Sequence, residues 1–308
     1  MICVIALIVF GILAVFSASY RPLAKEAWDC VLRRITLRKC ESGLNERLRS
    51  QIAGRLMTKS PKTAALVFRH FELLSWILVL LTISSLGYGA YGAYNYYQYG
   101  NCYGPEDSTS FCPFAAFDGE TNSGFESDYA GEMVFPTADD DPAIGPEDAK
   151  VTMIEFGCYM CPYTKEAEPI VNELLKEYEG KIRFVFRDFP LPSHEETRLH
   201  AVAADCALEQ GKFWEMHDKF FEMQDECRAA EDHWLMVDNA AKGIGLDFEK
   251  FAECVDSGKY DKEVEKDIND GIKAKIVGTP TFFINNRTIT GPKPIKAFEA
   301  IIEEELEK

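Results

Sequence analysis

The chain has 308 residues, 47% of them apolar, and a formal net charge of −17 at pH 7. This length allows more than one module, and the acidic balance argues against nucleic acid as a partner. The charge is uneven, because residues 20–70 carry twelve Lys and Arg against four Asp and Glu. The rest of the chain is therefore more acidic than the total suggests.

Two apolar stretches near the start predict membrane-spanning helices. Residues 1–19 contain no charged side chain, and a second apolar run covers residues 73–94. Each is close to the ~20 residues that cross a bilayer. The first run lacks the basic segment that opens a secretory signal peptide. We therefore expect two transmembrane helices, residues 1–19 and 71–94, with a cleaved leader as the alternative for the first.

The basic segment 20–70 predicts the orientation of the chain. Short loops rich in Lys and Arg stay in the cytoplasm, so everything beyond Tyr94 is expected to be extracytoplasmic. Within the loop, the stretch 28–40 is amphipathic and predicts contact with anionic membrane lipid; a solvated loop that only sets the topology is the alternative. On the reducing side of the membrane, Cys30 and Cys40 are expected to be free thiols.

Residues 95–148 are expected to form an extracytoplasmic linker. From Gly100 onward the composition shifts to Gly, Pro, Ser, Asp and Glu, which is typical of segments with little regular structure. Cys102 and Cys112 lie in this linker, on the oxidising side. A local disulfide between them is the expected arrangement, and a pair that relays electrons to a second site is the alternative.

The stretch Val151–Thr164 carries the strongest chemical signal in the chain. A short apolar strand, Val151–Phe156, is followed by Cys158 and Cys161, and Pro162 then opens a helical pattern. Proline is well tolerated at the first helical position, so one cysteine lies at the helix N-terminus, where peptide N–H groups and the helix dipole favour a thiolate. This pattern predicts a redox-active pair. The alternatives are a structural disulfide and a zinc site, but zinc needs a second close ligand pair, which we do not find, so no metal is expected.

A second motif, Gly-Thr-Pro-Thr-Phe-Phe-Ile-Asn, occupies Gly278–Asn285. A strand led by proline marks an edge or a special turn. An α/β domain is expected around the two motifs, and Asn-Asn suits a tight hairpin turn because Asn tolerates positive φ. The expected elements are strands 151–156, 182–186, 281–284 and 287–290, helices 162–178 and 295–306, and a helical stretch from 195 to 273.

Together the two motifs resemble the DsbA-like branch of the thioredoxin superfamily, over roughly Asp139 to Lys308. Three further stretches carry the resemblance: D-D-P-A-I-G-P-E-D-A, R-D-F-P-L-P and G-K-F-W-E-M-H-D. The resemblance implies a thioredoxin-like α/β fold for residues 149–308, with an inserted helical subdomain at about 193–273. It also implies a redox-active disulfide without any other cofactor, and a cis Pro280 against that disulfide.

The resemblance further implies a structural Cys206–Cys254 bridge across the inserted helices. Cys227 would then be unpaired, although the sequence alone also allows it to pair with either of the other two.

One departure from the family pattern concerns the order of the cysteines. The family has C-P-x-C, with the first cysteine as nucleophile. Aligned on Pro162, the nucleophile position is Cys161, the usual resolving position is Thr164, and Cys158 lies three residues upstream of Cys161. We expect Cys161 to attack and Cys158 to resolve; the reverse assignment is the alternative.

Further residues are expected to complete the site. Glu155, at the end of the strand below the cysteines, is a candidate proton shuttle for the resolving thiol, with a solvated Glu as the alternative. His217 is expected to pack within the helices, and no partner is predicted for His194 or His200. The substrate is expected to contact Tyr159, Met160, Pro162, Thr279 and Pro280.

These expectations give a membrane-anchored, extracytoplasmic thiol–disulfide oxidoreductase that introduces disulfides into exported proteins by exchange. Its reoxidation would need a membrane partner of the DsbB or vitamin K epoxide reductase-like type. Two alternatives remain. One is a reductase or isomerase of the same fold, and the other is a non-enzymatic, membrane-tethered binding or chaperone module.

Overall fold

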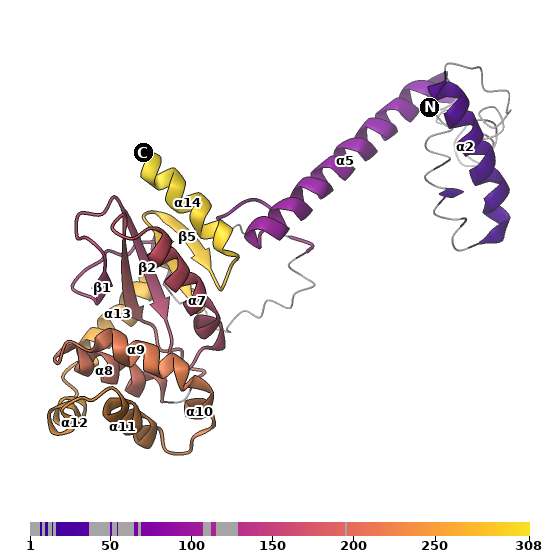
Figure 1. The fold of residues 1–308 in the computed structure, drawn as a ribbon. Helices are drawn as coiled ribbons and strands as arrows, with labels where there is room; N and C mark the ends of the chain where they lie inside the picture. Colours follow the sequence, from indigo (N-terminus) through magenta and orange to yellow (C-terminus); the bar gives the residue numbers. More distant parts are fainter. Residues whose placement is uncertain are drawn as a thin grey trace. The chain divides into compact units, whose positions relative to one another are not determined.

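The computed structural model describes residues 17–36, 69–106, 112–114, 129–194 and 196–308, with a few isolated positions between 7 and 66. The chain divides into two compact units, Met1–Ala90 and Tyr91–Lys308. Figure 1 labels most of their helices and strands.

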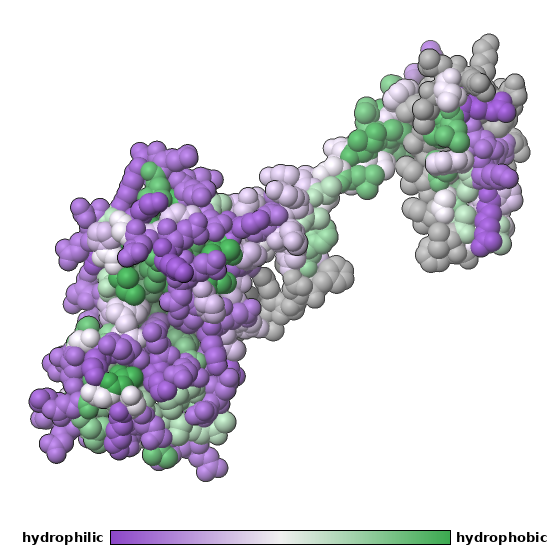
Figure 2. All heavy atoms as spheres, viewed as in Figure 1, coloured by the Kyte–Doolittle hydropathy of each residue, from purple (hydrophilic) through white to green (hydrophobic). Residues whose placement is uncertain are grey.

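In the first unit, a 3₁₀ turn η1 (Ala18–Tyr20) leads into α2 (Arg21–Ile35), and α5 (Phe71–Tyr99) begins here. Among the described residues, α5 is the one helix with the length and hydropathy of a membrane span, over Trp76–Tyr99. Figure 2 shows its hydrophobic residues exposed. Most of the expected first span, 1–19, lies outside the described residues.

Cys30 does not have the state expected from the sequence. It lies on the same face of α2 as Ala27, and both side chains are buried. Cys30 is disulfide-bonded, to a partner outside the described residues, so the expectation of a free thiol is wrong. The buried face of α2 keeps this sulfur away from solvent. Cys40 lies outside the described residues.

The second unit contains one five-stranded sheet in the order β1-β3-β2-β4-β5. The two central strands, β2 and β3, run parallel, and β4 and β5 form an antiparallel hairpin beside β2. The parallel pair requires a crossover, which a helix supplies. The strands are β1 (Ala143–Ile144), β2 (Val151–Gly157), β3 (Ile182–Asp188), β4 (Thr281–Ile284) and β5 (Arg287–Thr290). This is the thioredoxin-like α/β fold that the resemblance implied.

Alternate residues of β2 face opposite layers, because side chains along a strand alternate between its faces. Val151 and Met153 join the core beneath α7 (Pro162–Glu177) and α14 (Ile295–Glu307). Ile154 and Phe156 join a second cluster on the other face, which contains both cysteines of the motif. Both faces of the sheet are thus covered, and by this alternation Glu155 faces the α7 side.

The inserted helices follow β3 and precede β4 in the sequence, and Figure 1 labels each of them. They are α8 (Thr197–Leu208), α9 (Phe213–Glu222), α10 (Gln224–Ala229), α11 (His233–Gly243), α12 (Phe248–Asp256) and α13 (Asp261–Lys273). Cys206 of α8 is bonded to Cys254 of α12, the pair that the resemblance implied, and Cys227 is a free, buried thiol.

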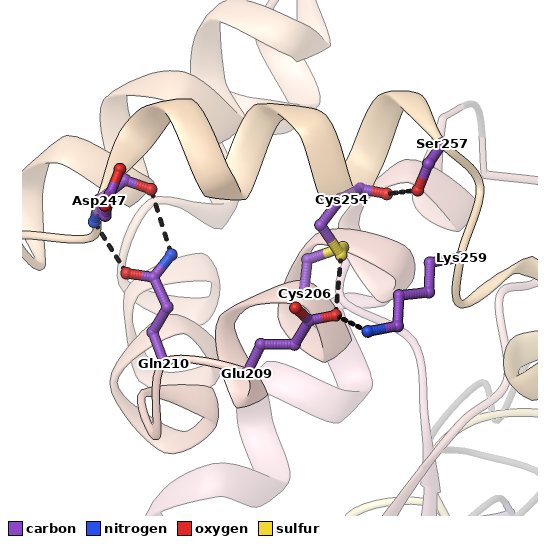
Figure 3. The surroundings of a disulfide bond; sticks show 7 residues. All are labelled: Cys206, Glu209, Gln210, Asp247, Cys254, Ser257 and Lys259. Carbon is purple, nitrogen blue, oxygen red and sulfur yellow. Dashed lines mark hydrogen bonds and ion pairs between the residues drawn. A yellow bond between two sulfur atoms is a disulfide. The ribbon is translucent and has the colours of Figure 1, made fainter.

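Figure 3 shows this disulfide with an ion pair, Glu209–Lys259, beside it. Its cysteines are 48 residues apart. Closing a loop of this length stabilises a fold by about 3–4 kcal/mol in the chain-entropy description. The bridge therefore holds α12 to α8, which packs on the site described below.

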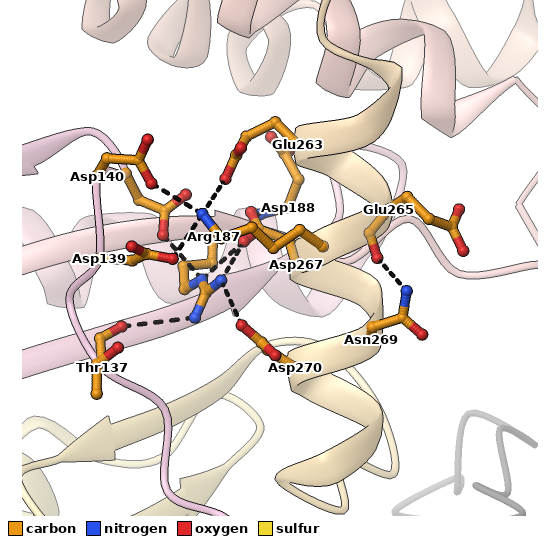
Figure 4. A network of polar contacts seen from close by, with 12 residues as sticks. Thr137, Asp139, Asp140, Arg187, Asp188, Glu263, Glu265, Asp267, Asn269 and Asp270 are labelled. Carbon is orange, nitrogen blue, oxygen red and sulfur yellow. Dashed lines mark hydrogen bonds and ion pairs between the residues drawn. The ribbon is translucent and has the colours of Figure 1, made fainter.

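The folded domain begins earlier than the expected boundary at residue 149. β1 pairs with β3 through Ala143 and Ile144. Arg187, buried at the end of β3, pairs with Asp141 at 2.9 Å and with Asp267 of α13 at 2.5 Å (Figure 4). The residues from about Thr137 onward thus belong to the domain and not to the linker.

The start of the expected linker is also in contact with the domain. Cys102 is bonded to Cys112, the local pairing expected, and its carbonyl accepts a hydrogen bond from Asn95 of α5. Lys296 of α14 donates to Gln98 at 2.8 Å. The last turns of α5 are therefore held against the C-terminal helix and are not part of a free tether.

Candidate active site

The cysteine motif forms a tight turn between β2 and α7. The Cys161 N–H donates to the carbonyl of Cys158 at 2.9 Å. Cys161 is the N-cap of α7, with Pro162 in the first turn. The proline that opens the helix therefore places Cys161 at the helix N-terminus, as its position in the sequence indicates.

The two sequence motifs meet at Cys161. Its thiol lies 3.1 Å from the carbonyl oxygen of Thr279, and the Thr279–Pro280 peptide bond is cis. Pro280 is buried. A backbone segment more than a hundred residues away in sequence thus borders the sulfur directly.

Cys158 has different surroundings. Its sulfur lies 3.3 Å from His194 Nδ1 and 3.2 Å from the Thr197 hydroxyl. Burial raises the pKa of the Cys158 thiol to about 11, so this group is a thiol near neutral pH. Both cysteines are free and buried, with 1% and 3% of their surface exposed.

Thr164 stands where the family pattern has its second cysteine. It is buried in the first turn of α7, and its hydroxyl accepts a long hydrogen bond, 3.5 Å, from the Cys158 N–H. The residue that replaces the usual resolving cysteine therefore helps to hold Cys158 in place.

Gln224, at the start of α10, is a site residue that the sequence analysis missed. Its side-chain N–H₂ donates to the carbonyls of Tyr159 and Cys161, at 2.7 and 2.9 Å. It therefore fixes the backbone between the cysteines. His194 and Thr197 were also missed, and the only sequence signal near them is the R-D-F-P-L-P stretch that precedes His194.

Four of the five residues expected to contact the substrate are buried, as Cys161 itself is: Tyr159, Met160, Thr279 and Pro280. Their contact with a substrate stays a prediction. The turn directs Tyr159 into an aromatic cluster with Phe186 and Phe220. Pro162 is exposed.

Glu155 is fully buried, so the alternative of a solvated carboxylate is wrong. Neither of its carboxyl oxygens has a hydrogen-bond partner among the described residues. Burial raises the pKa of Glu155 well above its ordinary value, and the neighbouring Glu168 and Cys161 raise it further. Burial therefore favours the protonated form of Glu155, and Cys161 is a thiol that influences it electrostatically.

His217 packs in the helical core, as expected. Its ring lies against Phe186 at 4.5 Å between centroids. Its two nitrogens lie 3.3 Å from the Tyr159 hydroxyl and 3.4 Å from Glu168. His200 is also buried, and its Nδ1 is hydrogen-bonded to the carbonyl oxygen of Glu196.

Three groups of side chains in the described part of the chain have a spacing compatible with a metal ion, and neither Cys158 nor Cys161 belongs to any of them. Arg187 pairs with two members of one group, Asp141 and Asp267, and Lys266 pairs with a second group. The third is Glu168, His217 and Asp218, where the imidazole already contacts Glu168.

A Cys-x-x-C at the N-terminus of a helix, beside a cis proline on a thioredoxin-like sheet, defines the class of thiol–disulfide oxidoreductases with this fold. A family model described as thioredoxin matches residues 137–304. The match covers more than half of the chain, which therefore belongs to this family, as a DsbA-like member.

Among solved structures, the chain is similar to oxidised BdbD from Bacillus subtilis, with 28% sequence identity and a TM-score of 0.51. That likeness covers 57% of this chain and 98% of BdbD.

Among curated proteins, it is similar to the Na(+)/H(+) antiporter NhaA 3 of Salinispora tropica, with 37% identity over 171 residues. It is also similar to the NhaA antiporter of Herminiimonas arsenicoxydans, with 32% identity over 159 residues. These matches cover 55% and 52% of this chain, but only 25% and 24% of the antiporters. The chain thus matches about a quarter of the length of these relatives.

Proposed function

We propose that this protein is a membrane-anchored oxidoreductase that introduces disulfides into exported proteins through Cys158 and Cys161. The observation that carries the proposal is the position of the Cys161 thiol, at the N-cap of α7 and 3.1 Å from the carbonyl before a cis proline. A second free thiol, Cys158, lies three residues away in the same turn.

The surroundings of the two sulfurs support different roles. A helix N-terminus favours an anion, because unpaired peptide N–H groups and the helix dipole point toward it. Cys161 has this position, whereas burial raises the pKa of Cys158. Cys161 is therefore the attacking sulfur and Cys158 the resolving sulfur.

The reaction is disulfide exchange. A substrate thiolate attacks Cys161 in the Cys158–Cys161 disulfide, the bond between the two cysteines breaks, and Cys158 leaves and takes a proton. A second substrate thiolate then attacks the substrate sulfur bound to Cys161. The substrate leaves with a disulfide, and both cysteines of the protein are reduced.

The backbone at Thr279 and Pro280 borders Cys161, so it would lie alongside an extended substrate segment. Glu155 lies within electrostatic reach of Cys161, and its carboxyl group can exchange a proton with that sulfur. A membrane protein of the DsbB or vitamin K epoxide reductase-like type would restore the disulfide.

Three features support a location of the domain outside the cytoplasm. α5 can span a membrane by length and composition, and residues 20–70 are strongly basic. The bridges Cys102–Cys112 and Cys206–Cys254 are typical of an oxidising compartment.

Trapping of mixed disulfides tests the assignment in the full chain. With Cys158→Ser, substrates should accumulate as mixed disulfides on Cys161, because the resolving thiol is gone. Cys161→Ser should trap none. The opposite pattern would reverse the assignment, and no trapping in either variant would remove the oxidoreductase proposal.

A redox titration of the Cys158–Cys161 pair tests the direction of the reaction. An oxidising protein should have a potential well above that of thioredoxin, about −270 mV. A value near thioredoxin's would assign the site to a reductase instead.

A further inference from the structure

The sulfur of Cys158 is bordered by an imidazole that the exchange mechanism above does not use. We propose that His194 is the catalytic base that takes the proton of Cys158 when Cys158 resolves a mixed disulfide on Cys161. This inference rests on the proposed function and adds a reacting group to it.

The first argument is geometric. His194 follows β3 in the segment that leads into α8, and its Nδ1 lies 3.3 Å from the Cys158 sulfur. This is within hydrogen-bond reach for a sulfur atom. Thr197, at the start of α8, lies 3.2 Å from the same sulfur. A hydroxyl can donate to a thiolate but does not accept its proton at neutral pH, so the imidazole is the acceptor of the two.

The second argument is chemical need. The thiolate is the nucleophile in disulfide exchange, but burial raises the pKa of Cys158 to about 11. Without a base, the resolving sulfur would be almost entirely protonated at neutral pH. Burial and the nearby Arg228 lower the pKa of His194, so its ring is neutral there and can accept a proton.

The third argument concerns the buried acid. Glu155 and Cys161 influence one another electrostatically, whereas His194 contacts the Cys158 sulfur directly, at 3.3 Å. Each sulfur of the pair therefore has its own titratable neighbour, Glu155 for Cys161 and His194 for Cys158.

In the proposed step, Cys158 gives its proton to Nδ1 of His194, and its sulfur attacks the sulfur of Cys161. The Cys158–Cys161 bond forms as the bond between Cys161 and the partner breaks. The electron pair leaves on the partner sulfur, which takes a proton from water. One disulfide replaces another, so no further oxidant is needed. In the reverse direction the imidazolium returns the proton to the departing Cys158.

Rapid quench of the full chain in detergent tests this step. Protein reduced at Cys158 and Cys161 is mixed with excess dithiobis(nitrobenzoate) and quenched with acid. Mass spectrometry then counts the nitrothiobenzoate adduct on Cys161 and the Cys158–Cys161 disulfide. The rate of adduct formation depends on the reagent concentration. Resolution by Cys158 is intramolecular, so its rate does not depend on that concentration. The two rates are thus separated, and the first also reports whether each variant is folded.

His194→Gln should slow resolution at least ~10-fold, since general bases typically contribute ~10²–10⁴-fold. His194→Gly should be equally slow, and added imidazole should restore its resolution rate, which a purely structural role would not allow. His233→Gln, on α11 and outside the site, is the matched control and should resolve like the unmodified chain. Cys158→Ser should hold the adduct permanently.

Resolution at the unmodified rate in His194→Gln, or no rescue of His194→Gly by imidazole, would overturn the role of His194 and leave the proposed function intact. A second result would contradict both the role of His194 and the proposed function. If Cys158→Ser forms no adduct on Cys161, then Cys161 is not the attacking thiol, and there is no step for His194 to assist.

Discussion

At the scale of single residues, the site separates two thiols that are neighbours in sequence. Cys161 lies at a helix N-terminus beside the Thr279 carbonyl, whereas Cys158 lies against a hydroxyl and an imidazole. The difference arises from the turn between β2 and α7, which holds both cysteines. Pro162 begins α7 and so ends this turn directly after Cys161. The two thiols, three residues apart in sequence, therefore have different surroundings.

Glu155→Gln tests the buried acid. Gln has nearly the same shape but no exchangeable acid proton, so formation of the mixed disulfide at Cys161 should slow ~10-fold or more. The unfolding free energy should not fall at pH 7–8, because the raised pKa of Glu155 makes an ionised carboxyl costly there. Stopped-flow exchange and urea denaturation measure the two effects. Full exchange activity in the variant would show that Glu155 takes no part in the reaction.

The sequence predicts the cysteines, Pro280 and the buried Glu155, because each belongs to a short motif with a local physical meaning. It does not predict His194, Thr197 or Gln224. These three reach the site from segments after β3, and their contacts depend on how the inserted helices pack. The same limit applies to Tyr159, since no local pattern shows that the turn directs this ring inward.

At the scale of elements, the buried Arg187 joins β3, α13 and the segment before β1. Its guanidinium contacts Asp141, Asp267 and Asp270 and lies 5.2 Å above the ring of Phe156. The buried guanidinium is one positive charge that faces three carboxyl groups. It cannot offset the free energy of burying all three as anions, so burial favours a proton on at least one of them. Burial and Asp267 raise the pKa of Asp141 to about 8.

This network predicts that the domain loses stability as the pH rises. The folded state keeps a proton on Asp141 that the unfolded chain loses above the ordinary pKa of 3.8, so the unfolding free energy should fall between pH 6.5 and 8. One proton accounts for at most about 1.4 kcal/mol per pH unit. His200 acts in the opposite direction near pH 6.5: burial lowers its pKa to about 4, so there the unfolded chain binds a proton that the folded state does not. The fall in unfolding free energy due to Asp141 is therefore clearest toward pH 8.

Urea denaturation at several pH values measures the slope. Asp141→Asn should reduce it, because the amide carries no titrating proton. A slope of the opposite sign, or one that the variant leaves unchanged, would contradict this account of the network.

The spacing of apolar residues in the sequence predicts four strands of the sheet and the two helices α7 and α14. β4 and β5 have the expected bounds, and the other shared elements differ by one or two residues. β1 was missed because a strand of two residues has no measurable alternation. The helical insertion was expected only as one stretch, since its six helices are separated by turns too short to show in composition.

At the scale of the whole molecule, the chain combines a unit that contains most of the candidate span with a thioredoxin-like unit. The basic segment argues for a cytoplasmic loop, whereas the disulfide at Cys30 is more typical of an oxidising compartment. These two observations give opposite answers for the side of the membrane on which α2 lies.

Epitope tags in membrane vesicles of known orientation decide the topology. A tag after Lys308 should be accessible from the extracytoplasmic side, and a tag inserted at Ser50 only after permeabilisation. If both tags are accessible from the extracytoplasmic side, the loop shares a compartment with the domain, and the two-span topology is wrong.

The burial of both thiols has a consequence for selectivity among oxidants. With almost no sulfur surface in contact with solvent, small dissolved oxidants such as peroxide collide with the reduced pair only when the surrounding backbone moves. The reduced pair should therefore be oxidised by peroxide more slowly in the folded chain than in the urea-unfolded chain, where both sulfurs meet the solvent.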